Sequence, residues 1–402
     1  MKFFDLLKTK EKENRKPFSI FLAAIFIFGV FYAGYLSGKS VCTPLPPADA
    51  DMTLFWQAWS TLEKNFVDKS KIDHQKMVYG AIEGMVGSLG DPYTSFFNPG
   101  DSKKFLEDTA GAFEGVGMEI GIKKDQLQVV TPLENSPAKK AGIRAGDLIV
   151  KIDGKSASGI TTDEAVDLIR GDKGTEVTLT LYREDWKETK DFKLTRAVIE
   201  VPSLKWEIKD GNIAYIQLYQ FTEKASNDFK AAAVDIINSP AKRIVLDVRN
   251  NPGGYLTVSQ DIAGWFLKKD DLVTREKLAG DKDGEEYRSN GPALLLKYPT
   301  VVLINQGSAS ASEILAGALR DDRNVQLVGE KSFGKGSVQQ LMPFGDGSSL
   351  KVTIAKWLTP NGSQISEIGL TPDVEVKNTV EDEDKGLDPQ LDKAIEIVKN
   401  LK

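Results

Sequence analysis

The sequence TVVLINQGSASASEILAGAL, residues 300–319, passes from an apolar run to an apolar helix through a turn of glycine and serine. The run before Asn305 is rich in β-branched residues, which is typical of a strand buried on both faces. Apolar residues then recur at helical spacing from Ile314 to Leu319. A strand followed by a turn and a helix is the building unit of an α/β domain, so we predict that fold from about residue 201 onward.

Ser310 stands at this turn, next to the start of the predicted helix. Backbone N–H groups at a helix N-terminus are unpaired, and the helix dipole favours negative charge there. Both an attacking serine oxygen and a developing oxyanion would be stabilised at such a position. Serine is also a common helix cap, and capping is the stronger interpretation of this motif taken alone.

A second turn has the same construction. The sequence RIVLDVRNNPGG, residues 243–254, ends a predicted buried strand and precedes a predicted helix over residues 256–267. Gly253 and Gly254 would allow backbone N–H groups to approach a ligand closely. Such turns gather at the carboxyl ends of the strands in an open α/β sheet, where ligands bind. Alone, the motif also fits a plain tight turn.

The third motif is GEKSFGKGSVQ, residues 329–339, which follows an apolar strand predicted over residues 325–328. Glycine on both sides of Lys335 would let the lysine be held in a confined site. Desolvation lowers the pKa of a buried lysine, which can then act as a base near neutral pH. An isolated G-K-G also occurs in flexible surface loops. The spacing of a phosphate-binding loop is absent.

The composition narrows the possible chemistry. The 402 residues are 41% hydrophobic and 27% charged, which predicts two or three globular domains. One cysteine, Cys42, and one histidine, His74, leave little material for a disulfide, a thiolate cluster or a zinc site, so we expect no metal and no cofactor. The net charge of −6 argues against nucleic acid as a partner. His74 lies in a helical pattern outside every glycine-flanked motif, so lysine is the remaining candidate for a base.

The N-terminus predicts a membrane anchor. Residues 18–38 are apolar and uncharged, which is about the 20 residues that a spanning helix needs. Lysines and an arginine precede this stretch, so residues 1–17 should stay in the cytoplasm and the rest should cross the membrane. A cleaved signal peptide is the alternative, with a possible cleavage site at residues 48–50. That site lies far beyond the apolar stretch, which is also long for a signal peptide.

The remaining domain boundaries follow from changes in composition and in the spacing of apolar residues along the chain. Residues 39–51 form a proline-containing linker. Residues 52–111 form a helical N-terminal region, whose helical pattern runs from about residue 52 to residue 89 and is broken by GDPY at 90–93. Residues 112–197 alternate short β-rich runs with glycine turns around one predicted helix, Thr162–Ile169, and predict a small, mostly β domain. The α/β domain occupies residues 198–376. An acidic tail and a C-terminal helix complete residues 377–402.

These motifs, in this order, resemble the carboxyl-terminal processing peptidases, the tail-specific proteases of the serine–lysine type. The resemblance covers nearly the whole chain after the predicted anchor. Besides the three turns, it rests on GDPYTS at 90–95, FEGVGM at 113–118, SPA at 136–138, AGI at 141–143, AGD at 145–147 and GLTPD at 369–373.

The resemblance implies a fold and a set of roles. The fold would be multidomain α/β, with a peptidase core similar to the crotonase and ClpP folds, an inserted PDZ domain and a helical N-terminal region. Ser310 would be the nucleophile, Lys335 the general base, and Gln339 the residue that orients the lysine. The oxyanion hole would use N–H groups of Ala311 and of Gly253, with Gly254 as the competing choice. Glu313 and Asp321 would have supporting, structural roles.

The PDZ-like segment implies how substrates would be chosen. In PDZ domains a peptide C-terminus adds a strand to the sheet edge, and its carboxylate binds N–H groups of a glycine loop. The matching residues are Gly115, Val116, Gly117 and Met118. Arg170, just after the predicted PDZ helix, could transmit docking to the peptidase core. The alternative is an interaction module unrelated to catalysis.

Together these features predict a membrane-anchored serine endopeptidase that cleaves proteins near exposed C-terminal tails through an acyl-enzyme. We expect it in a bacterial cytoplasmic membrane with its catalytic part outside the cytoplasm, and the resemblance makes a homodimer plausible. An alternative of another class is a catalytically silent, membrane-tethered PDZ adaptor, against which intact Ser310 and Lys335 argue. A crotonase-like acyl-CoA enzyme fits less well, because a PDZ insert and export would be unusual for it.

The topology can be tested directly. Because basic residues precede the apolar stretch, residues 52–402 should lie outside the cytoplasmic membrane. Protease added to cells whose outer layers have been opened should digest this part, as followed by immunoblotting. Protection of a soluble cytoplasmic form would contradict the prediction.

Overall fold

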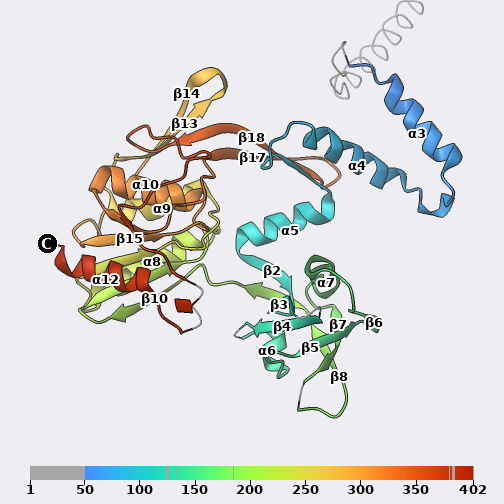
Figure 1. Ribbon diagram of the computed structural model, residues 1–402, viewed down its shortest axis with the longest axis horizontal. Helices are drawn as coiled ribbons and strands as arrows, with labels where there is room; N and C mark the ends of the chain where they lie inside the picture. Colours follow the sequence, from blue (N-terminus) through green and yellow to red (C-terminus); the bar gives the residue numbers. More distant parts are fainter. Residues whose placement is uncertain are drawn as a thin grey trace, which may run out of the picture. The chain divides into compact units, whose positions relative to one another are not determined.

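In this computed structural model the described residues are 50–123, 126–133, 135–183, 185–379, 381–382 and 385–401 (Figure 1). The predicted anchor, residues 18–38, lies outside the described residues. Within the described ranges, no helix combines the length and the apolar character needed to cross a membrane. The chain divides into two compact units, Met1–Met77 and Val78–Lys402.

The first unit is helical where it is described, as the sequence pattern predicts. It contains α3 (Thr53–Asn65), a short 3₁₀ turn η1 (Lys69–Lys71) and the beginning of α4 (His74–Gly87). His74 is exposed: its Nε2 lies 2.8 Å from Glu63 Oε1, and its ring stacks on Trp59 with centroids 5.9 Å apart. The prediction of a surface histidine is therefore confirmed.

A small β domain follows in the second unit. Its sheet has the strand order β3-β4-β5-β7-β8, so β3 forms an edge, and β6 pairs with β5. The helix predicted at Thr162–Ile169 is present as α7 and begins with a capping box between Thr161 and Glu164. The elements are β2 (Ala112–Gly115), β3 (Met118–Lys123), β4 (Gln126–Pro132), α6 (Pro137–Lys140), β5 (Leu148–Ile152), β6 (Lys155–Ser156), α7, β7 (Glu176–Tyr182), β8 (Lys190–Thr195) and β9 (Ala197–Glu200). Strands β2 and β9 pair with each other where the chain enters and leaves the domain.

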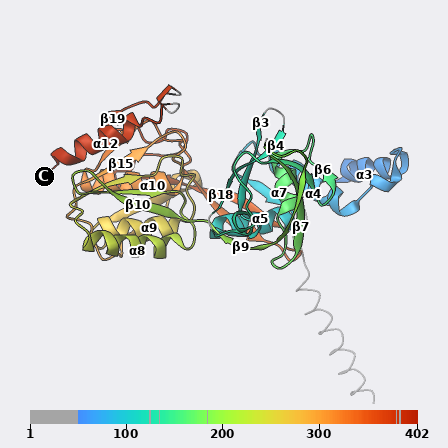
Figure 2. The same ribbon diagram turned by 90° about the horizontal axis from the view of Figure 1, so that it is seen from below.

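The α/β core is built on a sheet with the order β10-β11-β12-β15-β16-β19. All of its pairings are parallel except that of β10 with β11. Alternate residues of β11 face opposite sides, so Ile216 packs with helices α8, α9 and α10 while Ile213 packs with α12 (Figures 1 and 2). The elements are β10 (Leu204–Lys209), β11 (Ile213–Leu218), α8 (Ala225–Asn238), β12 (Arg243–Asp247), α9 (Leu256–Phe266), β15 (Thr300–Ile304), α10 (Ala311–Arg323), β16 (Gln326–Gly329), β19 (Val374–Glu375) and α12 (Pro389–Asn400). Helices on both faces explain why its strands are apolar runs rather than alternating ones.

A second sheet stands beside this core and was not predicted from the sequence. Its order is β1-β18-β13-β14, and β17 also pairs with β18. The elements are β1 (Ser95–Phe97), β13 (Leu272–Leu278), β14 (Lys282–Arg288), β17 (Ser337–Pro343) and β18 (Ser349–Leu358). A further helix that was not predicted, α5 (Pro99–Ala110), leads from β1 to the β domain.

An ion pair fastens α12 to the turn after β12. Arg249 donates to both carboxylate oxygens of Asp388, at 2.8 Å each, and Asp388 is the N-cap of α12. Burial alone would raise the pKa of Asp388, but the hydrogen bonds from Arg249 and from the Leu391 N–H hold that pKa below its usual value. Gln390, two residues further along and the second residue of α12, accepts from Arg249 at 3.0 Å and donates to Glu330 at 3.2 Å. The start of α12 thus touches two of the three turns singled out in the sequence.

Candidate active site

The three motifs meet at one edge of the core sheet. Strands β12, β15 and β16 are parallel neighbours, so the turns that follow them emerge on the same side. Residues from all three turns line one cleft of about 410 Å³. These are Gly253 and Gly254 after β12, Ser310 after β15, and Lys335 and Gln339 after β16. The fold therefore brings together the residues that the sequence predicts as catalytic.

Ser310 occupies a strained backbone position. Its φ and ψ angles are 55° and −116°, outside the regions that a serine ordinarily adopts, and α10 begins at the next residue. Strain of this kind persists only where surrounding contacts hold the backbone in place, and it concentrates at functional sites. The Ser310 N–H donates to Glu313 Oε2 at 2.9 Å, which holds the turn from the helix side.

Hydrogen bonds from the neighbouring residues join the serine turn to the turn after β12. Ser308 Oγ donates to the Val248 carbonyl at 2.7 Å, and the Ala309 N–H donates to the Asn251 carbonyl at 3.0 Å. Ser312 Oγ donates to the same Asn251 carbonyl at 2.9 Å. Sequence reasoning missed these structural roles. The sequence features that could have indicated these roles are the serines on both sides of Ser310 and the asparagine before the two glycines.

The turn after β12 brings two glycines against the serine. A Cβ atom on Gly253 would lie 2.7 Å from the Ala309 carbonyl oxygen and 2.8 Å from Ser310 Cβ, so only glycine fits. The Gly253 N–H is already used, because it donates to Asn251 Oδ1 at 2.9 Å. In contrast, the N–H groups of Gly254 and Ala311 donate to no residue that the structure describes. In this arrangement Gly254 is the better placed of the two glycines to bind an oxyanion.

The carboxylate of Glu313 holds the third turn to the first. Besides the Ser310 N–H, it accepts from Ser332 Oγ and from the N–H groups of Gly334 and Lys335, at 2.5, 2.8 and 3.0 Å. Burial raises the pKa of Glu313, and these four donors oppose that rise. The side chain is inaccessible to solvent. Glu313 therefore holds the backbone at both Ser310 and Lys335, which fits the supporting role that the family resemblance implied.

Lys335 is half-buried in the cleft. Desolvation lowers its pKa, and the Glu313 carboxylate partly opposes this change. Its Nζ lies 5.7 Å from the centre of the Tyr93 ring, which comes from the GDPYTS motif. Among the described residues, no hydrogen bond joins Lys335 Nζ to Ser310 and no carboxylate forms an ion pair with it. The two side chains share a cleft without touching.

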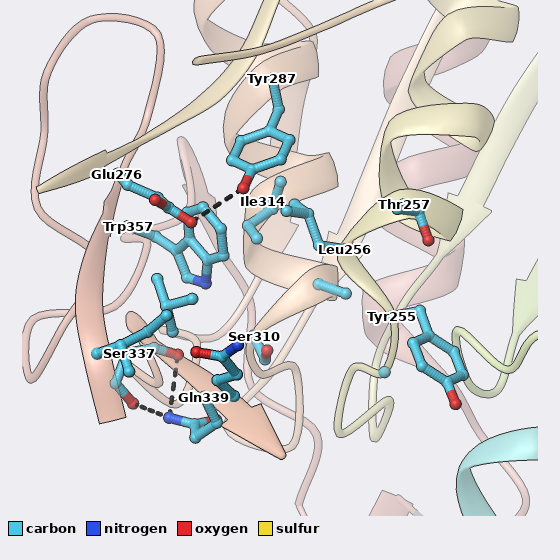
Figure 3. Close-up of a pocket in the computed structure, with 15 residues that line it drawn as sticks. Tyr255, Leu256, Thr257, Glu276, Tyr287, Ser310, Ile314, Ser337, Gln339 and Trp357 are labelled. Carbon is cyan, nitrogen blue, oxygen red and sulfur yellow. Dashed lines mark hydrogen bonds between the residues drawn. The ribbon is translucent and has the colours of Figure 1, made fainter. Parts of the chain in front are cut away.

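Gln339 and Asp321 lie in different surroundings. Gln339 Nε2 donates to the carbonyl and to the hydroxyl of Ser337, at 3.1 and 2.6 Å (Figure 3). Asp321 lies three turns along α10 from Ser310, where it accepts from the Asn361 N–H at 3.1 Å. Its contacts are those of a structural residue.

The predicted carboxylate loop lies at the mouth of a small groove in the β domain. Gly117, Val116 and Met118 line this groove together with α7 residues, beside the edge strand β3. The N–H groups of Val116 and Gly117 donate to no residue in the described part of the chain. Arg170 also lines the groove, where its guanidinium stacks 4.4 Å from the centre of the Phe113 ring. It pairs at 3.0 Å with Asp108 of α5.

A second cavity, of about 360 Å³, opens beside Ser310 (Figure 3). It lies between α9, α10 and the second sheet, and it shares Gly254, Tyr255, Ser310 and Gln339 with the cleft that contains Lys335. Sequence reasoning gave no sign of it, because its walls come from strands β13, β14 and β18 of the sheet that was not predicted. It gives the site a second compartment.

Comparison with known proteins places this arrangement among peptidases. Three family models match successive parts of the chain: the N-terminal domain of the activating protease CtpB at residues 39–100, a PDZ domain at 128–183 and peptidase family S41 at 212–376. These matches confirm the prediction of a multidomain α/β peptidase that carries a PDZ domain.

Individual relatives agree with the family models. A carboxy-terminal-processing protease of Bartonella bacilliformis is 42% identical over 325 residues, which cover 79% of this chain and 74% of that protein. The carboxy-terminal processing protease CtpB of Bacillus subtilis is 35% identical over 380 residues, covering 90% and 78%. The crystal structure of a putative S41 protease from Bacteroides fragilis covers 89% of this chain and 100% of its own, with a TM-score of 0.54. Its identity is 17%, so it supports the fold alone.

Replacing Glu313 by glutamine tests the role of its carboxylate. The side-chain amide of glutamine would place an N–H donor against backbone N–H groups that now donate to the carboxylate. The turns after β15 and β16 should therefore loosen. We expect the rate at which a fluorophosphonate labels Ser310 to fall at least about tenfold, and the free energy of unfolding to fall by about 1–3 kcal/mol. Asp321→Asn, at the far end of the same helix, is the matched control and should label at the wild-type rate. Equal labelling of Glu313→Gln and wild type would contradict this role.

Proposed function

The chain belongs to peptidase family S41, among the carboxy-terminal processing proteases, and from this membership we propose that it is a serine endopeptidase with Ser310 as nucleophile and Lys335 as general base. One observation carries the proposal. Ser310 and Lys335 line the same cleft as Gly254, and the N–H groups of Gly254 and of Ala311, the residue after the serine, donate to no described residue. Membership of this family itself makes the chain a serine-type peptidase that processes C-termini.

The proposed reaction begins with a neutral lysine. Lys335 takes the proton of Ser310 Oγ as the oxygen attacks the scissile carbonyl, and the resulting oxyanion is bound by the N–H groups of Ala311 and Gly254. The Lys335 ammonium then gives its proton to the leaving amine, and the peptide bond breaks to leave an acyl-enzyme. Water, deprotonated by Lys335 in the same way, hydrolyses the ester and restores Ser310.

This mechanism requires the lysine side chain to move. Its Nζ lies against the Tyr93 ring, so the flexible stem has to turn toward Ser310 before the proton can transfer. Gln339 also lines this cleft, and its side-chain nitrogen donates to the carbonyl and to the hydroxyl of Ser337. We assign it the role of holding the amine in the turned position, where its side-chain oxygen would accept from the ammonium.

Substrate tails are proposed to bind the PDZ domain. The edge of β3 is free to accept an added strand, and the N–H groups of Val116 and Gly117 are available for a terminal carboxylate. Arg170 touches both this groove and α5, which lines the catalytic cleft through Phe105 and Leu106. Docking of a tail would therefore act on the cleft through α5.

Anchoring in the membrane by residues 18–38 is part of the proposal and rests on the sequence. The apolar stretch and the basic residues before it support an uncleaved anchor with the peptidase outside the cytoplasm. Such a position would present the cleft to exported protein tails. A homodimer remains a prediction from the family resemblance.

The base is tested by Lys335→Arg. Arginine keeps its charge at any working pH, so it cannot accept the serine proton, and this variant should be as inactive as Lys335→Ala. Each loss of kcat should be several orders of magnitude and non-additive with Ser310→Ala. Wild-type activity should rise with pH as Lys335 loses its proton, through an apparent pKa below that of free lysine, about 10.4. Steady-state cleavage of a peptide between pH 6 and 10 measures both effects.

His74→Ala is the control for this experiment, because His74 is exposed and pairs with Glu63. It should cleave at the wild-type rate. Near-normal turnover by a folded Lys335→Arg, or loss of activity in a folded His74→Ala, would show that the serine–lysine mechanism is wrong.

Tail recognition is tested with one substrate in two forms. A protein that ends in apolar residues with a free carboxylate should be cleaved faster than the same protein amidated at its C-terminus, because the amide removes the charge that the Val116 and Gly117 N–H groups would bind. The comparison is made at substrate concentrations below KM. Equal kcat/KM for the two forms would remove the PDZ domain from substrate selection.

A further inference from the structure

The cavity beside Ser310 is a compartment with one charged end. Most of its walls away from Ser310 are apolar side chains and aromatic rings, and polar side chains line the rest. The apolar and aromatic residues are Leu256, Ile314, Val338, Ile354, Trp357 and Tyr287, and the uncharged polar ones include Thr257, Ser337, Gln339 and Gln340. Among the described residues that line it, Glu276 alone carries a charge. Figure 3 shows Glu276, Tyr287 and Trp357 grouped on one side of the cavity, and Ser310 nearer to Gln339. An occupant that starts at Ser310 would therefore pass apolar walls before it reaches the carboxylate.

The position of Lys335 decides which part of a substrate this cavity holds. In the proposed mechanism Lys335 protonates the leaving amine, so the leaving part of the substrate lies on the Lys335 side of Ser310. Lys335 lines the cleft but does not line this cavity. The cavity, which also contains Ala311 and Gly254, therefore lies on the acyl side. It is placed to hold the side chain of the residue whose carbonyl is attacked.

The carboxylate of Glu276 has few partners for a buried charge. The residue is 9% exposed, and no Lys or Arg among the described residues forms an ion pair with it. Tyr287 donates to it at 3.0 Å, but this hydroxyl also lies 3.1 Å from Glu285 and has only one proton to donate. The Glu285 N–H is 3.5 Å away. A buried carboxylate that accepts so few hydrogen bonds would be strongly stabilised by a bound cation.

The surroundings keep this carboxylate in place. Glu276 lies opposite Trp357 in the pairing of β13 with β18, and the Trp357 and Tyr287 rings meet edge to face with centroids 5.6 Å apart. On the other side, a Cβ atom on Gly284 would lie 2.7 Å from Glu276 Cβ, so β14 passes closely over it. Aromatic faces beside a carboxylate also favour a cation.

We propose that this cavity is the specificity pocket of the peptidase and that Glu276 selects a lysine or arginine side chain immediately before the cleaved bond. The inference rests on the proposed function, because it uses Ser310 and Lys335 to orient the substrate. The apolar stem of the side chain would lie along Ile314 and Leu256, and its cationic end would bind Glu276 and the ring of Trp357. A purely apolar side chain would leave the carboxylate buried and without a cation.

A matched pair of peptides tests the proposal. The two share one sequence and one free C-terminus, and they carry either lysine or norleucine before the cleaved bond. Norleucine keeps the four-carbon stem and lacks the ammonium group. For the wild type, kcat/KM should favour lysine by about tenfold or more, the effect of one buried charge-assisted interaction. Glu276→Gln should bring the ratio close to one. Glu285→Gln is the control, because Glu285 is exposed, also contacts Tyr287 and does not line the cavity.

The possible outcomes separate this inference from the proposed function. Wild-type enzyme that is labelled by a fluorophosphonate at Ser310 but prefers norleucine overturns the pocket assignment alone. A lysine preference that persists in Glu276→Gln overturns the role of Glu276. Wild-type enzyme that is neither labelled nor cleaves either peptide contradicts the serine–lysine proposal itself. If Glu276→Gln does not fold, Glu276→Asp replaces it: its withdrawn carboxylate should reduce the preference, and an unchanged ratio would overturn the proposal.

Discussion

The carboxylate of Glu313 is the contact on which the catalytic arrangement depends. The residues that we propose to react, Ser310 and Lys335, follow the ends of two different strands, and nothing in the strands themselves fixes how the loops after them lie. Glu313 connects these loops because it stands one turn into α10, where its oxygens reach the Ser310 N–H on one side and the Gly334 and Lys335 N–H groups on the other. Burying a carboxylate is costly, and four donors at 2.5–3.0 Å offset that cost. The serine and the lysine are thus held in fixed register by a group that does not react.

The division of the site into two compartments follows from the second sheet. β17 carries Gln339 between the cleft that contains Lys335 and the cavity that contains Glu276, and Ser310 opens into both. One compartment suits the departing part of a peptide, because it contains Lys335, the proposed proton donor. The other suits the part that stays attached to the enzyme. Hydrolysis of an extended chain needs this separation, since the two halves of the substrate leave at different times.

Much of the core could be predicted from the sequence because its signals are local. The strands β12 and β15 are apolar runs, the helices after them have helical periodicity, and the turns between them are marked by glycine and serine. The β domain was predicted for the same reason, including its helix α7. The second sheet was missed because β13, β14 and β18 are half exposed and rich in charged residues, so their pairing depends on long-range contacts. The roles of Asn251 and Ser312 were missed because they are hydrogen bonds between distant turns.

The ion pair between Arg249 and Asp388 has a consequence for the order in which the chain can fold as it is synthesised. Residues 388 and 390 are synthesised well after the nucleophile turn, yet they hold the loops after both β12 and β16. A chain that emerges residue by residue would therefore have its serine exposed before the support for the neighbouring loops exists. Until α12 docks, Asp247 is the only carboxylate in the described part of the chain that pairs with Arg249, and the glycine turn beside it lacks one of its anchors. The loop after β12 therefore gains its last support only when the C-terminal helix has been completed.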